Sequence, residues 1–314
     1  MDISIIIPAK NAEKYLDRCL KSLSKALTAA RSVESEVLVV DNGSDDKTLM
    51  LACKWREKAF PGAVHILQCA TPGAAAARNY GISKAKGEYI WIIDADDAIG
   101  EDSIRELLKT AREEEADLVM MGAKRIYPDG RRDYLSAVTK KDPNYKSRFV
   151  RYGAGPWQMI FRRKWWLERK ISFHEGIIHE DMELISALIL YTEKFTGVDK
   201  PFYLYYQNPE SVLHRSKFNP HIFDIFPALT GLYQRFEQAH ATEKYYAELE
   251  WFFIWNLLID SAKDFAKFPE GKPGFARSRK MLKKYFPHWR RNRFLREKSL
   301  KLRIFVRKNY YHMI

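Results

Sequence analysis

The chain has 314 residues, of which 46% are hydrophobic and 30% charged, and its 53 Lys and Arg residues outnumber its 40 Asp and Glu residues to give a net charge of +13. This composition is typical of a globular protein with one large or two small domains, and it excludes a disordered or fibrous chain. No apolar run approaches the roughly 20 residues that cross a bilayer, and the N-terminus has no basic segment ahead of an apolar core. Cys19, Cys53 and Cys69 follow neither zinc nor disulfide spacing, so we expect buried free thiols in a cytoplasmic protein.

The first 121 residues alternate short apolar runs with helical patterns. Runs of β-branched and bulky apolar residues predict buried strands at 3–7, 36–40, 64–67, 89–93 and 118–121. Apolar residues at three-and-four spacing predict helices at 12–30, 46–59, 74–84 and 102–115. This series predicts an α/β fold with a doubly wound, mainly parallel sheet, whose ligands bind beyond the carboxyl ends of the strands.

The alternation weakens after this region. Residues 123–215 contain a turn at 128–130, a helical pattern at 180–191 and an aromatic strand at 202–206, and we interpret them as a continuation of the same domain. From 219 onward the pattern is helical and rich in aromatic residues, which predicts a C-terminal helical extension.

Acidic residues follow the fourth predicted strand. Asp94, Asp96 and Asp97 emerge where the apolar run YIWII ends. Two carboxylates in this position can hold a hard divalent cation that bridges to a diphosphate. The alternative is that Asp97 and Asp102 cap the next helix.

Polar residues also follow the second and third predicted strands. Asp41 ends the run VLVVD, where a carboxylate can accept the imide N–H of a pyrimidine base; the alternative is an ordinary turn and helix cap formed with Ser44 and Asp45. The Pro72-Gly73 turn and Arg78 begin the next helix, which suits contact with a diphosphate. A buried small-residue helix with a solvated Arg78 is the alternative.

Five segments, in order, resemble the family 2 glycosyltransferases with the GT-A fold. They are IIIPAKNAEKYLDRCLKSL, VLVVDNGSDDKT, PGAAAARNYGISKAKGEYIWIIDADD, ISFHEGIIHEDMEL and YLYYQNPESVLH, and they cover residues 1 to 215. The order of the motifs is more specific than any one of them. The resemblance implies a nucleotide-sugar-binding half at 1–122 and an acceptor-binding and catalytic half at 123–215 of the same domain. Residues 216–314 lie outside the match, and their pattern and charge predict a helical, basic C-terminal region.

The resemblance also implies an inverting transfer from a nucleotide diphosphate sugar, usually a UDP-sugar, to a hydroxyl of a saccharide or lipid-linked saccharide. Such reactions assemble surface polysaccharide, lipopolysaccharide or capsule. The implied donor-binding residues are Pro8, Ala9, Asn11, Asp41, Asn42, Arg78, Asp94 and Ala95. Asp96 is the implied ligand of Mn²⁺ or Mg²⁺; Asp97 is the alternative ligand, with the other carboxylate capping the helix.

The His179-Glu180-Asp181 motif matches the position of the general base in this family. Asp181 is the expected base and Glu180 is expected to orient the base or the acceptor. Without the resemblance, two acids in a first helical turn favour a dipole contact. His214 is a further metal or diphosphate candidate, and Trp157, His174 and His179 are candidates for the acceptor cleft, although each is as well explained by packing.

The last 38 residues hold the entire charge excess, with 14 Lys and Arg residues against the single acid Glu297. Aromatic and aliphatic residues interleave with these cations. The pattern is typical either of a peripheral helix on an anionic membrane or of helices that pack on the body of the enzyme. Two rival functions remain: a nucleic-acid-binding protein that uses this tail, and a sugar nucleotidyltransferase. The strand-end acids argue against the first, and we expect no nucleic-acid partner.

Overall fold

A computed structural model describes residues 1–59, 64–208 and 217–311 of the chain. The chain forms two compact units. The first unit comprises Met1–Tyr145, Gly155–Gly176 and Tyr191–Glu210, and the second comprises Lys146–Ala154, Ile177–Leu190 and Ser211–Ile314.

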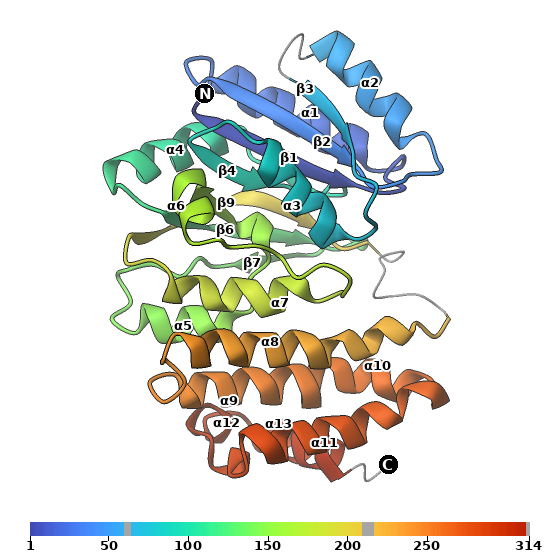
Figure 1. Cartoon of the computed structure of the whole chain (residues 1–314), viewed down its shortest axis with the longest axis vertical. Helices are drawn as coiled ribbons and strands as arrows, with labels where there is room; N and C mark the ends of the chain where they lie inside the picture. The colour runs from blue at the N-terminus through green and yellow to red at the C-terminus, as the bar shows by residue number, and fades with distance from the viewer. Residues whose placement is uncertain (60–63, 209–216, 312–314) are drawn as a thin grey trace. The chain divides into compact units, whose positions relative to one another are not determined.

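The first unit is built on a mixed sheet, whose first four parallel strands confirm the sequence prediction (Figure 1). They lie side by side in the order β3-β2-β1-β4. Their bounds are β1 (Ile3–Ala9), β2 (Ser35–Asp41), β3 (Val64–Gln68) and β4 (Tyr89–Ile92). The helices between and after them are α1 (Leu16–Ala29), α2 (Thr48–Ala59), α3 (Ala74–Lys84) and α4 (Ser103–Glu113). Because both faces of a parallel sheet are covered, β1, β2 and β4 are rich in buried apolar residues and easily identified, whereas the edge strand β3 is partly exposed.

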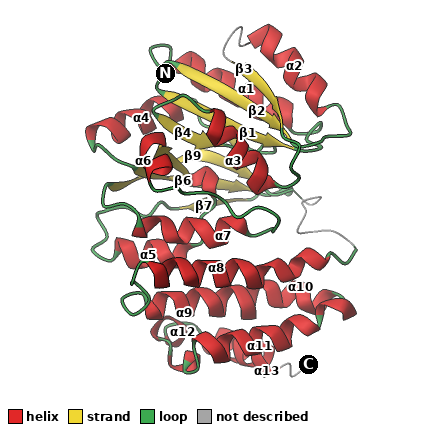
Figure 2. Ribbon diagram, in the orientation of Figure 1, coloured by secondary structure: helices red, strands yellow, loops and turns green. Residues whose placement is uncertain are grey.

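The sheet continues beyond β4 with strands of both directions (Figure 2). The short strand β8 (Met159–Arg162) runs antiparallel between β4 and β6 (Leu118–Ile126), and β9 (Phe195–Tyr206) is parallel to β6. Two further strands, β5 (Ala98–Ile99) and β7 (Arg132–Leu135), pair antiparallel with β9 and β6, and α6 (Arg163–Glu168) follows β8. Six of the nine strands in the described residues therefore run in one direction. The expected boundary at 122–123 falls within β6.

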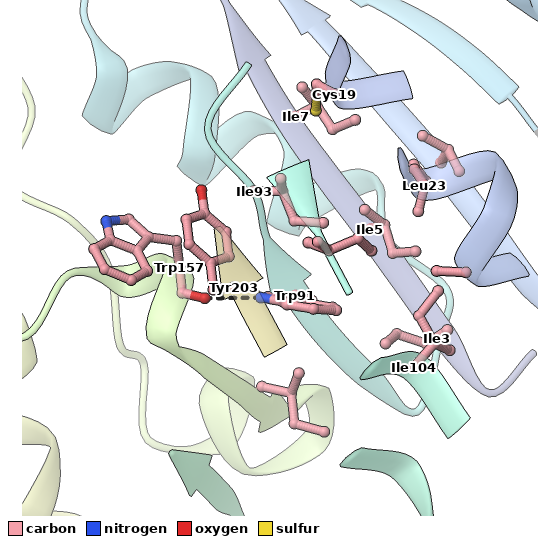
Figure 3. Close-up of a cluster of buried hydrophobic side chains, with 14 of the residues drawn as sticks. Ile3, Ile5, Ile7, Cys19, Leu23, Trp91, Ile93, Ile104, Trp157 and Tyr203 are labelled. Atoms are coloured by element: carbon pink, nitrogen blue, oxygen red, sulfur yellow. Dashed lines mark hydrogen bonds between the residues drawn. The ribbon is translucent and has the colours of Figure 1, made fainter. Parts of the chain in front are cut away.

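The core on one face of the sheet forms where α1 packs on β1 and β4 (Figure 3). Alternate residues of β1, Ile3, Ile5 and Ile7, are fully buried there with Cys19 and Leu23 of α1. Trp91 of β4 joins this core, and its indole N–H donates a 2.9 Å hydrogen bond to the carbonyl oxygen of Trp157. This bond ties the short turn Pro156–Gln158 to the centre of the sheet.

The cysteine expectation is confirmed for one residue and wrong for two. All three thiols are free, and Cys19 is buried, but Cys53 and Cys69 are partly exposed. Cys69 directly follows the end of β3, and Cys53 lies on α2, whose apolar stripe is weak because charged residues interrupt it. Neither position therefore faces the core.

The second unit is helical in its described residues, as the sequence pattern predicted for those from 219 onward. α5 (Tyr145–Tyr152) spans the boundary with the first unit, and α7 (Glu180–Leu184) continues as a 3₁₀ turn, Ile185–Leu190. The later helices are α8 (Ile225–Gln238), α9 (Tyr246–Trp255), the π-helical segment Asn256–Asp260, α10 (Ser261–Lys267), α11 (Pro273–Tyr285), α12 (Arg293–Arg296) and α13 (Leu300–Tyr311). None of the helices in the described part of the chain has the length and apolarity that crossing a membrane requires.

Candidate functional site

The carboxyl ends of β1, β2 and β4 bring together most of the predicted donor-binding residues. Pro8 and Ala9 end β1 and pair with Val40 and Asp41 of β2. Asp41 is only 6% exposed, and its Oδ2 accepts a long bond of 3.4 Å from the Ser44 N–H. Its Oδ1 is buried and has no hydrogen-bond partner among the described residues. A buried carboxylate oxygen without a donor is costly, so this atom indicates a place for a ligand N–H or O–H.

Asn11 and Asn42 hold the loops that surround Asp41. The Asn42 amide donates to the carbonyl oxygens of Cys69 (3.2 Å) and Thr71 (2.7 Å), and its Oδ1 accepts from the Gly73 N–H at 2.7 Å. Asn11 has a left-handed backbone conformation (φ 51°), and its Oδ1 accepts from the Asp45 N–H at 2.9 Å. These bonds fix the loops after β1, β2 and β3 relative to one another.

Arg78 and Asp94 form the charged pair of this region. Arg78 lies on α3 and is nearly buried, and its Nη2 is 3.3 Å from Asp94 Oδ1. The guanidinium also lies over the Phe173 ring at 5.5 Å. The alternative prediction, that the Arg78 side chain is solvated, is therefore wrong. Arg78 is an ordered cation beside the acid Asp94.

Asp97 does not cap the following helix, so that alternative is wrong. It is fully buried, with Oδ2 accepting from Tyr203 Oη at 2.7 Å and Oδ1 accepting from the Tyr206 N–H at 2.8 Å. Asp102 does not cap α4 with its side chain either, because its carboxylate pairs with Arg105 at 2.7 Å. Both oxygens of Asp97 are thus used within the protein, which leaves Asp94 and Asp96 as the carboxylates that can face a ligand.

The turn that carries Asp94 and Asp96 is held from two sides. Tyr203 Oη accepts from the Asp94 N–H at 3.1 Å, and Arg18 of α1 donates through Nη2 to the carbonyl oxygen of Asp96. The Arg18 guanidinium stacks on the Tyr206 ring at 3.7 Å. Burial and then the charge of Asp94 raise the pKa of Asp96, although a hydrogen bond from Asn208 opposes the shift.

Asp94 and Asp96 fit the divalent ion that the family resemblance implies. Within the described ranges, no group of three or more His, Cys, Asp and Glu side chains is arranged to hold a metal ion by itself. Mg²⁺ sites commonly use one or two carboxylates and take the remaining oxygens from phosphates and water. A partly buried pair of acids at a strand end matches that donor set.

The predicted base and its neighbours belong to the second unit. His179 has a left-handed backbone conformation (φ 71°) and precedes α7, where Glu180 is buried and Asp181 is partly exposed. Asp181 Oδ1 accepts from the Met182 N–H at 2.9 Å. Asp224 holds the preceding loop, because its Oδ2 accepts from the Ile178 N–H at 3.0 Å.

α8 anchors the helix that carries Asp181. Glu183 of α7 is nearly buried, and its Oε1 accepts two bonds from Arg235 of α8, at 2.9 and 3.1 Å. Gly231 makes this approach possible, since a Cβ at that position would lie 2.4 Å from Glu183 Cδ. The C-terminal helices therefore set the position of α7 within the second unit.

The remaining predicted residues have diverse surroundings. Trp157 is nearly buried and stacks on Tyr203 at 4.4 Å and Tyr205 at 5.0 Å, so it packs inside the first unit. His174 is exposed in the same unit, Ala95 is buried in the turn between Asp94 and Asp96, and His214 lies outside the described residues. The expected boundary at 215–216 also falls outside them.

Residues 4–172 match the family model for glycosyl transferase family 2, which is 169 of the 314 residues. The chain belongs to this family. The enzyme is a glycosyltransferase related to transferases of teichoic acid and polysaccharide assembly. The family match ends before Glu180 and Asp181, whose assignment rests on the motif described above.

Two curated relatives illustrate how widely the match extends. The glycosyltransferase is 24% identical to the uncharacterized glycosyltransferase EpsJ of Bacillus subtilis over 77% of its own length and 72% of that protein. It is 27% identical to a poly(ribitol-phosphate) beta-glucosyltransferase of Bacillus spizizenii over 66% of its own length. That match spans only 32% of the relative, about a third of the longer protein.

A solved structure shows the same fold. TarS 1–349 of S. aureus, in complex with UDP-GlcNAc, superposes with a TM-score of 0.72 at 21% identity. The superposition covers 99% of the glycosyltransferase and 89% of the TarS chain. It confirms the GT-A architecture expected from the sequence.

Sequence reasoning missed Arg18, Tyr203, Tyr206 and Asn208. Arg18 sits among ordinary surface positions of an amphipathic helix, and nothing in its spacing marks it. The run FYLYY did predict a strand, but Asp97, the hydrogen-bond partner of Tyr203, is 106 residues earlier in the chain. The pairing of β9 with β5 brings Tyr203 and Asp97 together.

We expect His179 to make the stability of the glycosyltransferase depend on pH. Burial lowers the pKa of His179, which the charges of Asp181, Asp224 and Asp264 oppose. Below pH about 6.5, His179 in the folded protein therefore binds fewer protons than it does in the unfolded chain. The free energy of unfolding is then highest above this pH and falls as the pH drops through the pKa of His179 in the folded protein. His179→Asn, which tolerates a left-handed backbone and does not titrate, should flatten this dependence.

Urea unfolding of both proteins at pH about 7.5 and about 5.5 measures the effect. The wild type should lose more stability between the two values than the variant does. If the wild type and the variant lost the same free energy of unfolding, groups other than His179 would account for the loss of stability at low pH.

Proposed function

We propose that this glycosyltransferase uses a UDP-sugar donor and that Asp41 recognises the uracil ring. The observation that supports this most directly is the buried Asp41 Oδ1 without a hydrogen-bond partner in the described part of the chain. The imide N3–H of uracil supplies the missing donor, whereas cytosine presents an acceptor at the same ring position. Asn42 and the Cys69–Gly73 loop frame this position.

Nucleotide binding to Asp41→Ala and Asp41→Asn tests the proposal. We expect Asp41→Ala to weaken UDP binding by about 1–3 kcal/mol and to leave CDP binding nearly unchanged, because only UDP loses a hydrogen bond. In Asp41→Asn the amide can donate to cytosine, which should narrow or reverse the preference for UDP. Isothermal titration with both nucleotides measures this, and an undiminished UDP preference in Asp41→Ala would exclude the assignment.

The donor is held, in this proposal, by the remaining strand-end residues. Pro8, Ala9 and Asn11 line the nucleoside, Arg78 faces the phosphates, and Asp94 and Ala95 contact the ribose and sugar. Asp96, with Asp94 beside it, would hold Mn²⁺ or Mg²⁺, which supplies charge compensation for a diphosphate leaving group. Arg78 is already oriented by its 3.3 Å contact with Asp94.

The reaction we propose is a single displacement with inversion. Asp181 accepts the proton of an acceptor hydroxyl, whose oxygen attacks the anomeric carbon while the bond from that carbon to the diphosphate oxygen breaks. The electron pair of the broken bond leaves on UDP, and the transferred proton remains on Asp181. The ion pair of Glu183 with Arg235 holds the helix that carries this base.

The acceptor in this proposal is a saccharide or lipid-linked saccharide of a surface polysaccharide. The name of one relative, a poly(ribitol-phosphate) beta-glucosyltransferase, supports the coarser part of this proposal, a hydroxyl acceptor on a polymer. We assign donor binding to residues 1–122 and acceptor binding and catalysis to 123–215, with Trp157 and His179 as acceptor contacts. Stacking on Tyr203 fixes the orientation of the Trp157 ring.

A further inference from the structure

α13 has one face that docks on the second unit and one that does not. Val306 is fully buried, and the Tyr310 ring packs against Trp289 at 4.9 Å. Asn309 donates through Nδ2 to the carbonyl oxygen of Leu258, at 2.7 Å, in the π-helical segment Asn256–Asp260. A π-helical turn disrupts the regular pairing of carbonyls, so this side chain supplies a specific partner there. The helix is therefore held in a defined orientation.

The opposite face of α13 is apolar and exposed. Leu300 is 63% exposed and Ile304 46% exposed. Tyr311 lies on the same side and is also exposed, and its hydroxyl accepts a hydrogen bond from Arg290. Phe305 is exposed too, but it lies about 100° away from Ile304 around the helix axis. At 3.6 residues per turn, Leu300, Ile304 and Tyr311 lie within about 40° of one another around the helix axis. The described residues contain ten exposed large apolar or aromatic side chains, and four of them lie on this helix of 12 residues. Such a concentration marks a binding surface rather than scattered exposure.

Basic side chains flank this apolar stripe on both sides. Helical spacing places Lys301 and Lys308 along one edge and Arg303 and Arg307 along the other. α13 contains no acidic residue. An exposed apolar stripe between two rows of cations fits a surface that is apolar at depth and anionic at its rim.

We propose that α13 binds the surface of an anionic membrane, with Leu300 and Ile304 inserted and the flanking cations at the lipid phosphates. A second copy of this chain is a poorer partner, because residues 277–314 of each copy carry the same excess of +13. Nucleic acid would pair with the cations but would leave the aliphatic stripe uncovered. The proposal is independent of the donor and the reaction.

Vesicle flotation with the full chain tests the proposal. The wild type should float with phosphatidylcholine vesicles that contain phosphatidylglycerol, and not with phosphatidylcholine alone. Leu300→Ser with Ile304→Ser should weaken binding more than tenfold, because two inserted side chains are lost at constant charge. Lys301→Gln, Arg307→Gln and Lys308→Gln together should weaken it roughly a hundredfold.

Matched controls come from exposed residues of the first unit. Met50→Ser with Leu167→Ser removes two exposed apolar side chains, and Lys21→Gln, Lys25→Gln and Lys54→Gln remove three exposed cations. Both sets should bind like the wild type. Circular dichroism checks that each α13 variant keeps its helices.

The following results would overturn the proposal: no flotation of the wild type, equal flotation with both vesicle types, or equal weakening by the control sets. Sedimentation tests whether a second copy of the chain binds the apolar stripe, and a DNA-binding assay tests whether nucleic acid binds the cations. Self-association that Leu300→Ser with Ile304→Ser abolishes would assign the stripe to a second copy. DNA binding that survives those substitutions, without flotation, would assign the cations to nucleic acid.

Discussion

Asp181→Asn is expected to lower the rate of sugar transfer by about 10²–10⁴-fold and to leave the affinity for the donor unchanged, because the variant lacks the group that accepts the hydroxyl proton. The substitution keeps the shape of the side chain and an oxygen that can accept from the Met182 N–H, the contact seen at 2.9 Å. Helix α7 should therefore stay in place. Transfer assays give the rate, and calorimetric titration of the donor gives the affinity.

Glu180→Gln is the matched control, because it makes the same chemical change at the adjacent residue. We expect a smaller loss from it, since Glu180 is buried and is assigned an orienting role. A larger loss in Glu180→Gln than in Asp181→Asn would exchange the two roles. A near-normal rate of sugar transfer by Asp181→Asn would show that Asp181 is not the general base.

Asp96→Ala is expected to remove the increase in donor binding and transfer that Mn²⁺ or Mg²⁺ produces. A lost metal contact to a diphosphate is worth several kcal/mol, so kcat/KM should fall more than about a hundredfold at saturating metal. The fold should persist, because Asp96→Ala removes the hydrogen bond from Asn208 but leaves the Asp97, Tyr203 and Arg18 contacts that hold the turn. Donor titrations with the metal and with a chelator measure the change.

Asp97→Asn separates a structural effect from a ligand effect. Its carboxylate accepts from the Tyr203 hydroxyl and the Tyr206 N–H inside the protein. We expect this variant to lose stability, by about 1–3 kcal/mol, but to keep a response to the metal. If Asp97→Asn abolished the metal response and Asp96→Ala did not, the two adjacent residues would have to exchange roles.

The parallel part of the sheet could be predicted because burial on both faces leaves a clear pattern. β1, β2 and β4 contain short runs of buried apolar residues, and polar residues stand at or just after the carboxyl end of each strand. β8 escaped prediction because it has four residues, MIFR, and no period can be read from so short a run. Its antiparallel place between β4 and β6 comes from pairing that is set by the whole sheet.

The residues that we propose to contact the donor were easier to identify in the sequence than the residues that hold them in place. Asp41, Arg78 and Asp94 follow strands or begin a helix, so local position marks them. Asp97 looked like a helix cap because its partner Tyr203 is remote in sequence.

In the basic tail, residues 277–314, sequence spacing also failed to separate buried residues from exposed ones. Its aromatic residues between 282 and 295 are mostly buried in the second unit, whereas the exposed apolar residues of the tail gather on α13. Spacing alone does not distinguish these two groups.

The central claim is that the strand-end residues bind a UDP-sugar and release UDP during transfer. The most direct measurement is nucleotide release from a panel of nucleotide sugars, with a saccharide acceptor and with or without Mn²⁺. We predict release of UDP from at least one UDP-sugar, stimulated by Mn²⁺ and accompanied by a new glycoside of inverted configuration. Pyrophosphate release from UTP and a sugar phosphate, with no UDP from any nucleotide sugar, would contradict the account.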